Sequence, residues 1–63
     1  MEDIMDLQQF IDSYRISTAG SYYERLDEAQ LFVSDAIGEV VDTPMSKIIA
    51  QAAVLYDVEE SDI

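Results

Sequence analysis

Hydrophobic side chains recur at helical spacing in three stretches of the chain. Short segments of small or turn-forming residues lie between these stretches. In residues 2–15 they return every three or four positions, at Ile4, Leu7, Phe10, Ile11 and Tyr14. In residues 21–41 they alternate between spacings of four and three, as in an a/d seam, at Tyr22, Leu26, Ala29, Val33, Ala36 and Val40. A third stretch covers residues 44–57 and precedes an acidic tail, residues 58–63. The pattern predicts an all-α fold: one small domain, residues 1–63, built as a three-helix unit.

Local signals mark where the second and third helices begin. Ser21 and Glu24 have the spacing of a capping box, which predicts the start of the middle helix. Thr43 is a suitable cap for the third helix, with Pro44 at its first position, where no backbone donor is needed. Gly38 offers an alternative end to the middle helix, because glycine costs about 1 kcal/mol inside a helix. We favour a helix that continues to about residue 41.

The third helix is apolar nearly all round. At about 100° per residue, one broad arc contains Met45, Ile48, Ile49, Ala52, Ala53, Leu55 and Tyr56. Ala50, Val54 and Val58 lie on the other side. Such a helix needs cover on more than one face, so we expect the long middle helix to lie antiparallel to it on one side.

Self-association is the expected source of further cover. A chain of 63 residues buries too little surface to be more than marginally stable, and it has no cysteine for a disulfide. We therefore expect a homo-oligomer, most simply a dimer. Four apolar residues are candidates for contact with a second copy or a partner: Leu31, Phe32, Val54 and Val58. For Phe32, burial in the chain's own core is the favoured interpretation.

Charge restricts the partners. The chain has 3 basic and 14 acidic residues, so its net charge is 3 − 14 = −11. Direct binding to nucleic acid or to an anionic membrane requires lysine and arginine that this chain lacks. No apolar run approaches the length of a membrane span, and the N-terminus Met1-Glu2-Asp3 lacks the basic start of a signal peptide. We expect a cytoplasmic protein whose partner is a protein, and a basic one.

Catalytic chemistry has little support in the sequence. General acid–base catalysis most often uses histidine, and the chain contains neither histidine nor a cysteine nucleophile. Its two glycines, Gly20 and Gly38, do not form a phosphate-binding loop. The acidic tail lacks the glycine and the length of a calcium-binding loop. We expect no enzyme activity, no cofactor and no metal site.

Carboxylates collect on one side of the middle helix. Within about 60° of one another at 100° per residue lie Glu24, Glu28, Asp35, Glu39 and Asp42. One interpretation is a solvated face on an acidic protein, which is what charge runs usually are. The other is a row of negative charges that imitates a phosphate backbone, with neighbours about 6 Å apart along the helix. Both interpretations have similar weight.

Two functions from different classes follow. The first is an inhibitor whose carboxylates occupy the basic surface of a nucleic-acid-binding protein. In charge and size the chain resembles the small acidic inhibitors that bacteriophages and mobile elements make, and an antitoxin that neutralises a basic toxin is a variant of this idea. The second is a homodimeric adaptor or assembly protein that binds through apolar helix faces, with acids for solubility only.

Overall fold

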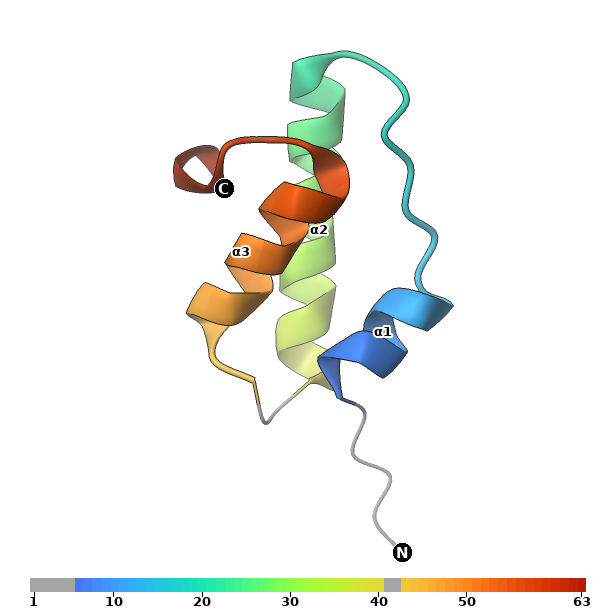
Figure 1. The fold of residues 1–63 in the computed structure, drawn as a ribbon, viewed down its shortest axis with the longest axis vertical. Helices are drawn as coiled ribbons and strands as arrows, with labels where there is room; N and C mark the ends of the chain where they lie inside the picture. Colours follow the sequence, from blue (N-terminus) through green and yellow to red (C-terminus); the bar gives the residue numbers. More distant parts are fainter. Residues whose placement is uncertain (1–5, 41–42) are drawn as a thin grey trace, which may run out of the picture.

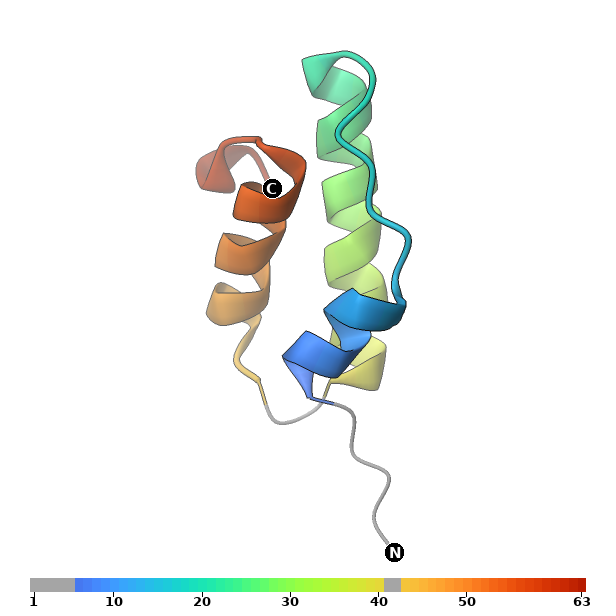
Figure 2. The same cartoon turned by 45° about the vertical axis from the view of Figure 1, so that its right-hand side comes forward.

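The computed structural model describes residues 6–40 and 43–63, and this part of the chain is all-α (Figure 1). It contains α1 (Leu7–Ser13), α2 (Tyr22–Glu39), α3 (Met45–Tyr56) and a short 3-10 helix, η1 (Glu60–Asp62). No strand occurs in the described residues. α2 and α3 lie side by side, and α1 packs across the lower half of α2 in Figures 1 and 2. The connecting segment, residues 14–21, is extended and runs back along α2 to the start of that helix (Figure 2).

The core is formed mainly by the facing sides of α2 and α3. α2 contributes Ala29, Phe32, Val33, Ala36 and Val40, α3 contributes Ile48, Ala52 and Tyr56, and α1 contributes Phe10. The three alanines are fully buried, and their small side chains let the helices approach closely. Four of the six residues of the predicted seam in the middle helix are therefore buried, and the other two, Tyr22 and Leu26, are half-buried.

Aromatic rings fasten α1 to this helix pair. Phe32 lies at the centre of the cluster, with its ring centroid 5.2 Å from Phe10, 5.2 Å from Tyr14 and 6.0 Å from Tyr56. All three pairs meet edge to face, an arrangement worth roughly 0.5–1.5 kcal/mol per pair beyond the burial of area. The cluster explains how a helix of 7 residues, too short to be stable alone, stays attached.

The first helix is shorter than predicted. Instead of residues 2–15 it spans Leu7–Ser13, and the predicted residues 2–5 lie outside the described part of the chain. Asp6 is its N-cap: its carboxylate accepts from the Gln9 amide at 2.8 Å, and the Gln9 side chain accepts from the Asp6 amide at 3.1 Å. At the other end Tyr14 is extended, so Tyr14 and Arg15 lie outside the helix.

The other two helices lie close to their predicted bounds. Ser21 and Glu24 form the predicted capping box of α2, and the helix continues through Gly38 to Glu39. The early end at Gly38 is therefore wrong by one residue, and the favoured end at about residue 41 is too late by two, because Val40 is the C-cap. α3 begins at Met45, with Pro44 at the N-cap and no side-chain cap, so the role expected of Thr43 is also wrong.

The acidic tail is held against α2. Tyr22 donates a hydrogen bond from its hydroxyl to the Asp62 carboxylate and accepts one from the Glu59 amide at 3.0 Å. The chain turns at Asp57, which adopts a left-handed conformation with φ 56°. Ile63 then packs against the core. The tail thus forms one turn of 3-10 helix rather than a simple extension of α3.

Candidate protein-binding face

The outward side of α2 carries acids and no base. Five carboxylates are exposed there, and we call them the acidic face: Glu24, Asp27, Glu28, Asp35 and Glu39. Four of these were predicted from the sequence. Asp27 was not, because it lies about 60° from Glu24 on the side away from the other acids. Asp42, also predicted, lies outside the described residues.

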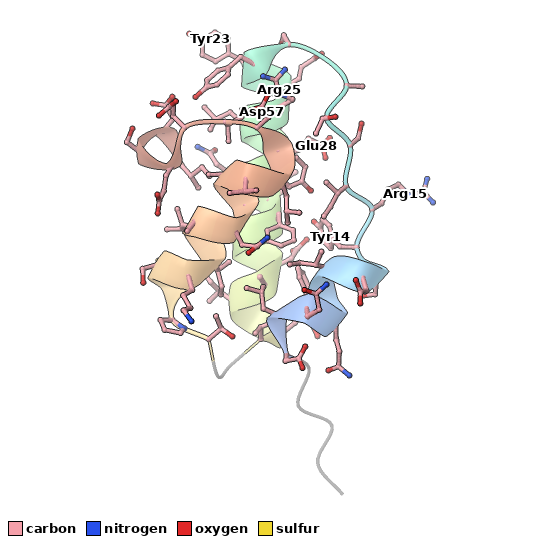
Figure 3. The ribbon with its side chains drawn as sticks, in the orientation of Figure 1. Tyr14, Arg15, Tyr23, Arg25, Glu28 and Asp57 are labelled. Carbon is pink, nitrogen blue, oxygen red and sulfur yellow. The ribbon has the colours of Figure 1, made fainter. Side chains whose placement is uncertain are left out.

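The connecting segment borders the acidic face. The Tyr14 hydroxyl donates to the Asp35 carboxylate at 2.7 Å, a contact between residues 21 positions apart in the sequence (Figure 3). Further along, Ser17, Ala19 and Gly20 line a hollow together with three members of the face: Glu24, Asp27 and Glu28. The face is therefore a surface of two segments rather than of one helix, which the helical pattern alone did not indicate.

Tyr14 is held in its protonated form at this border. Burial of the ring, the hydrogen bond to the Asp35 carboxylate and the negative charge of that carboxylate raise the pKa of Tyr14 to about 12. The hydroxyl consequently remains a hydrogen-bond donor throughout the physiological range. It fixes the Asp35 carboxylate of the face in position.

Glu24 has a second role at the start of α2. Its carboxylate accepts from the Ser21 amide at 2.9 Å, as the reciprocal half of the capping box. Gly20 lies directly against it with φ +100°, and a Cβ at that position would collide with the Glu24 carboxylate. The close packing of the connecting segment on this end of α2 therefore requires glycine at position 20.

Aromatic and acidic groups meet in a second hollow, at the other end of the face. It has a volume of about 350 Å³ and is lined by Phe10, Ser13, Tyr14, Asp35 and Glu39. Two carboxylates beside an aromatic ring match what a guanidinium or ammonium group binds, by charge-assisted hydrogen bonds and by cation–π contact.

The one basic residue of α2 is committed to backbone carbonyls. Arg25 is committed to the end of α3, where it donates from Nε to the Tyr56 carbonyl at 3.0 Å and from Nη2 to the Asp57 carbonyl at 3.3 Å. It also donates from Nη1 to the Gly20 carbonyl at 3.0 Å. A cation there stabilises the negative end of the α3 dipole. Arg15 extends outward from the connecting segment (Figure 3), and Lys47 is on α3.

The predicted apolar contact residues divide into two groups. Leu31 and Val54 are exposed, with 55% and 75% of their surface accessible. Phe32 is completely buried and Val58 is half-buried against the same core, so in this structure neither presents a free apolar surface. For Phe32 the favoured interpretation, core burial, is the one that the structure supports. Sequence reasoning missed three further exposed apolar side chains: Tyr23, Ile37 and Met45.

Comparison of the chain with protein-family models, with curated proteins and with solved structures finds no match in any of the three. Among the described residues, no helix has the length and apolar character needed to cross a membrane. In the same part of the chain, no three acidic side chains gather as ligands of a metal ion would.

Proposed function

We propose that the protein is a non-enzymatic binding module whose acidic face occupies the basic surface of a protein partner, and that this partner binds nucleic acid. The observation that carries the proposal is the separation of charge on α2. Five exposed carboxylates share its outward side, while Arg25, the one base in the helix, is turned to the end of α3.

The arrangement costs stability, which supports a role in binding. Glu24 and Glu28, and likewise Asp35 and Glu39, are like charges one helical turn apart. Each pair destabilises the helix by about 0.2–0.5 kcal/mol. Alternating signs would remove this cost without loss of solubility.

The charge of the face suits a surface that normally meets phosphates. The paired carboxylates come from residues about 6 Å apart along the helix axis, so they form a row of negative charge on one side of α2. The hollow beside Tyr14, Asp35 and Glu39 would receive one lysine or arginine of the partner. A net charge of −11 would steer association and make it fast and strongly dependent on salt.

Affinity capture from the native host tests the proposal. A variant with Asp27→Asn, Glu28→Gln and Glu39→Gln neutralises three members of the face that make no side-chain hydrogen bond within the described residues. Its matched control, Asp12→Asn, Glu59→Gln and Glu60→Gln, makes the same change in net charge elsewhere. We expect the wild type and the control to capture a basic protein that a salt gradient elutes, and the face variant to lose it. Equal capture by both variants would contradict the proposal.

A second candidate function rests on the exposed apolar side chains. Tyr23, Leu31 and Val54 each expose more than half of their surface, which favours an adaptor that binds partners through apolar helix faces. In this hypothesis the antiparallel pair of α2 and α3 is a scaffold, supported by the contact of Arg25 with the end of α3. Capture that is insensitive to salt and lost on Leu31→Glu would favour this candidate over the first.

A further inference from the structure

An uncharged stripe runs along α2 beside its row of carboxylates. At about 100° per residue, the side of the helix opposite the core carries four exposed residues, which we call the α2 stripe: Tyr23, Leu31, Ser34 and Gly38. They lie within an arc of about 80°. Asp27 lies in the same arc, and the other four carboxylates of the acidic face follow one edge of it. The other edge is formed by Gln30 and Ile37, so negative charge borders the α2 stripe on one side only.

The α2 stripe presents two large side chains to solvent. Tyr23 exposes 79% of its surface and Leu31 exposes 55%. The ring of Tyr23 meets that of Tyr22 edge to face, with the ring centroids 5.9 Å apart. The hydroxyl of Tyr22 is in turn hydrogen-bonded to Glu59 and Asp62 of the tail. Tyr23 is therefore supported in its outward position, and it loses little conformational freedom when a partner covers it.

Gly38 is the least expected residue of the α2 stripe. Glycine weakens a helix interior relative to alanine, and a Cβ at this position would meet nothing within 4 Å. No contact within the described residues therefore requires glycine here, in contrast to Gly20, where a Cβ would collide with Glu24. Glycine also permits the close approach of another backbone, and Ser34, one turn earlier, is small as well. A close approach from outside the chain accounts for glycine at position 38.

We infer that the α2 stripe receives an amphipathic α-helix of the basic partner, an inference that rests on the proposed function. The apolar side of that helix contacts Tyr23 and Leu31 and passes close to Gly38. Lysines or arginines along one edge of the same helix reach the carboxylates of the acidic face. An amphipathic helix laid along an apolar surface is a recurring mode of recognition between proteins.

Charge complementarity selects this occupant. The acidic face follows the stripe along one edge, so a helix that covers the stripe brings its own edge within reach of several carboxylates at once. A second copy of the chain does not meet this requirement, because two chains of net charge −11 repel each other. The inference thus adds to the proposed function a stated shape for the partner: a helix with bases on one edge and small or apolar side chains beside them.

Two synthetic peptides of the same length as α2 test the inference. Both are built from alanine, leucine and lysine and have identical compositions. In the first, leucine and alanine follow one side of a helix and lysines follow one edge of it. In the second, the order is permuted so that no apolar side forms. Fluorescence anisotropy of each labelled peptide measures its affinity for the purified chain at constant salt, and we expect the amphipathic peptide to bind at least about tenfold more tightly.

Gly38→Gln is the disrupting variant, because it fills the place of closest approach and glutamine suits a helix better than glycine. Ser46→Gln is the matched control, since it places the same side chain at an exposed position of α3. Circular dichroism confirms that both variants remain helical. We expect Gly38→Gln to weaken binding of the amphipathic peptide by roughly tenfold, and Ser46→Gln to change it by less than about twofold.

Three results would overturn the inference: equal affinity of the two peptides, unchanged binding to Gly38→Gln, or a dimer of the chain alone that Gly38→Gln abolishes. Equal affinity that is lost when Asp27, Glu28 and Glu39 are neutralised would leave the proposed function intact, because charge alone would then govern binding. Failure of both peptides to bind at low salt would contradict the proposed function as well.

Discussion

The hydroxyl of Tyr56 provides a direct test of how the core is packed. Tyr56, the last residue of α3, is completely buried and its ring packs against Phe32 of α2. Its hydroxyl has no hydrogen-bond partner among the described residues. Burial, and the nearby charge of Glu28, raise the pKa of this tyrosine, so the group stays protonated and uncharged. A buried polar group without a partner costs about 1–3 kcal/mol. Replacing Tyr56 with phenylalanine removes the hydroxyl and keeps the ring.

We therefore expect Tyr56→Phe to stabilise the protein by about 1 kcal/mol, the lower end of that range, because the ring contacts with Phe32 are retained. For a domain of this size, that gain raises the melting temperature by roughly 4–8 °C. Thermal unfolding followed by circular dichroism measures it, with all variants at the same protein concentration.

Tyr14→Phe is the matched control, since it deletes a tyrosine hydroxyl that does have a partner, the Asp35 carboxylate at 2.7 Å. It should lower stability by about 0.5–1.5 kcal/mol. The reasoning would be refuted if Tyr56→Phe melted at or below the temperature of the wild type, because its hydroxyl would then make a stabilising contact.

Two further predictions concern backbone freedom and pH. Gly20→Ala should destabilise the chain by about 1–2 kcal/mol, because alanine is strained at φ +100° and its Cβ meets Glu24. Gly38→Ala should instead stabilise α2 by up to about 1 kcal/mol, because nothing lies within 4 Å of its added Cβ. Urea unfolding measures both changes in stability, and changes of the same sign would contradict the structure. Native Tyr14 ionises near pH 12 and an unfolded tyrosine near pH 10, so the native state binds more protons in that interval. The contribution of Tyr14 to stability is therefore complete below about pH 10 and is lost as the pH rises to about 12. The free energy of unfolding of Tyr14→Phe should consequently fall less steeply over this interval than that of the wild type. An equal fall in both proteins would show that Tyr14 does not donate to the Asp35 carboxylate.

Local signals in the sequence were enough to predict that the chain is helical and where α2 begins. The Ser21 and Glu24 capping box and the regular seam of α2 depend on residues within a few positions of each other, so their spacing alone identifies them. The same kind of signal at Asp6 and Gln9 was overlooked, because Ile4 extended the apolar pattern beyond it and favoured an earlier start. Phe32 was ambiguous because its position flanks the seam, and only the packing of α1 across α2 shows that it is buried.

The details of the acidic face could not be predicted in this way. The hydrogen bond from Tyr14 to Asp35, and those from Arg25 to the end of α3, join residues that lie 21 and 31 to 32 positions apart. Such contacts depend on how the helices are arranged in space, which periodicity does not specify. Helical spacing identified four of the five carboxylates, but not the connecting segment beside them or the commitment of Arg25 elsewhere.

Competition with a DNA duplex tests the proposed function most directly. A basic protein captured on the immobilised chain is challenged with increasing concentrations of double-stranded DNA at constant salt, and the fraction that remains bound is measured. If the acidic face occupies a nucleic-acid-binding surface, the duplex should displace the captured protein completely, and an uncharged polymer at equal mass should not. A captured protein that stays on the chain while it binds the duplex would contradict the account.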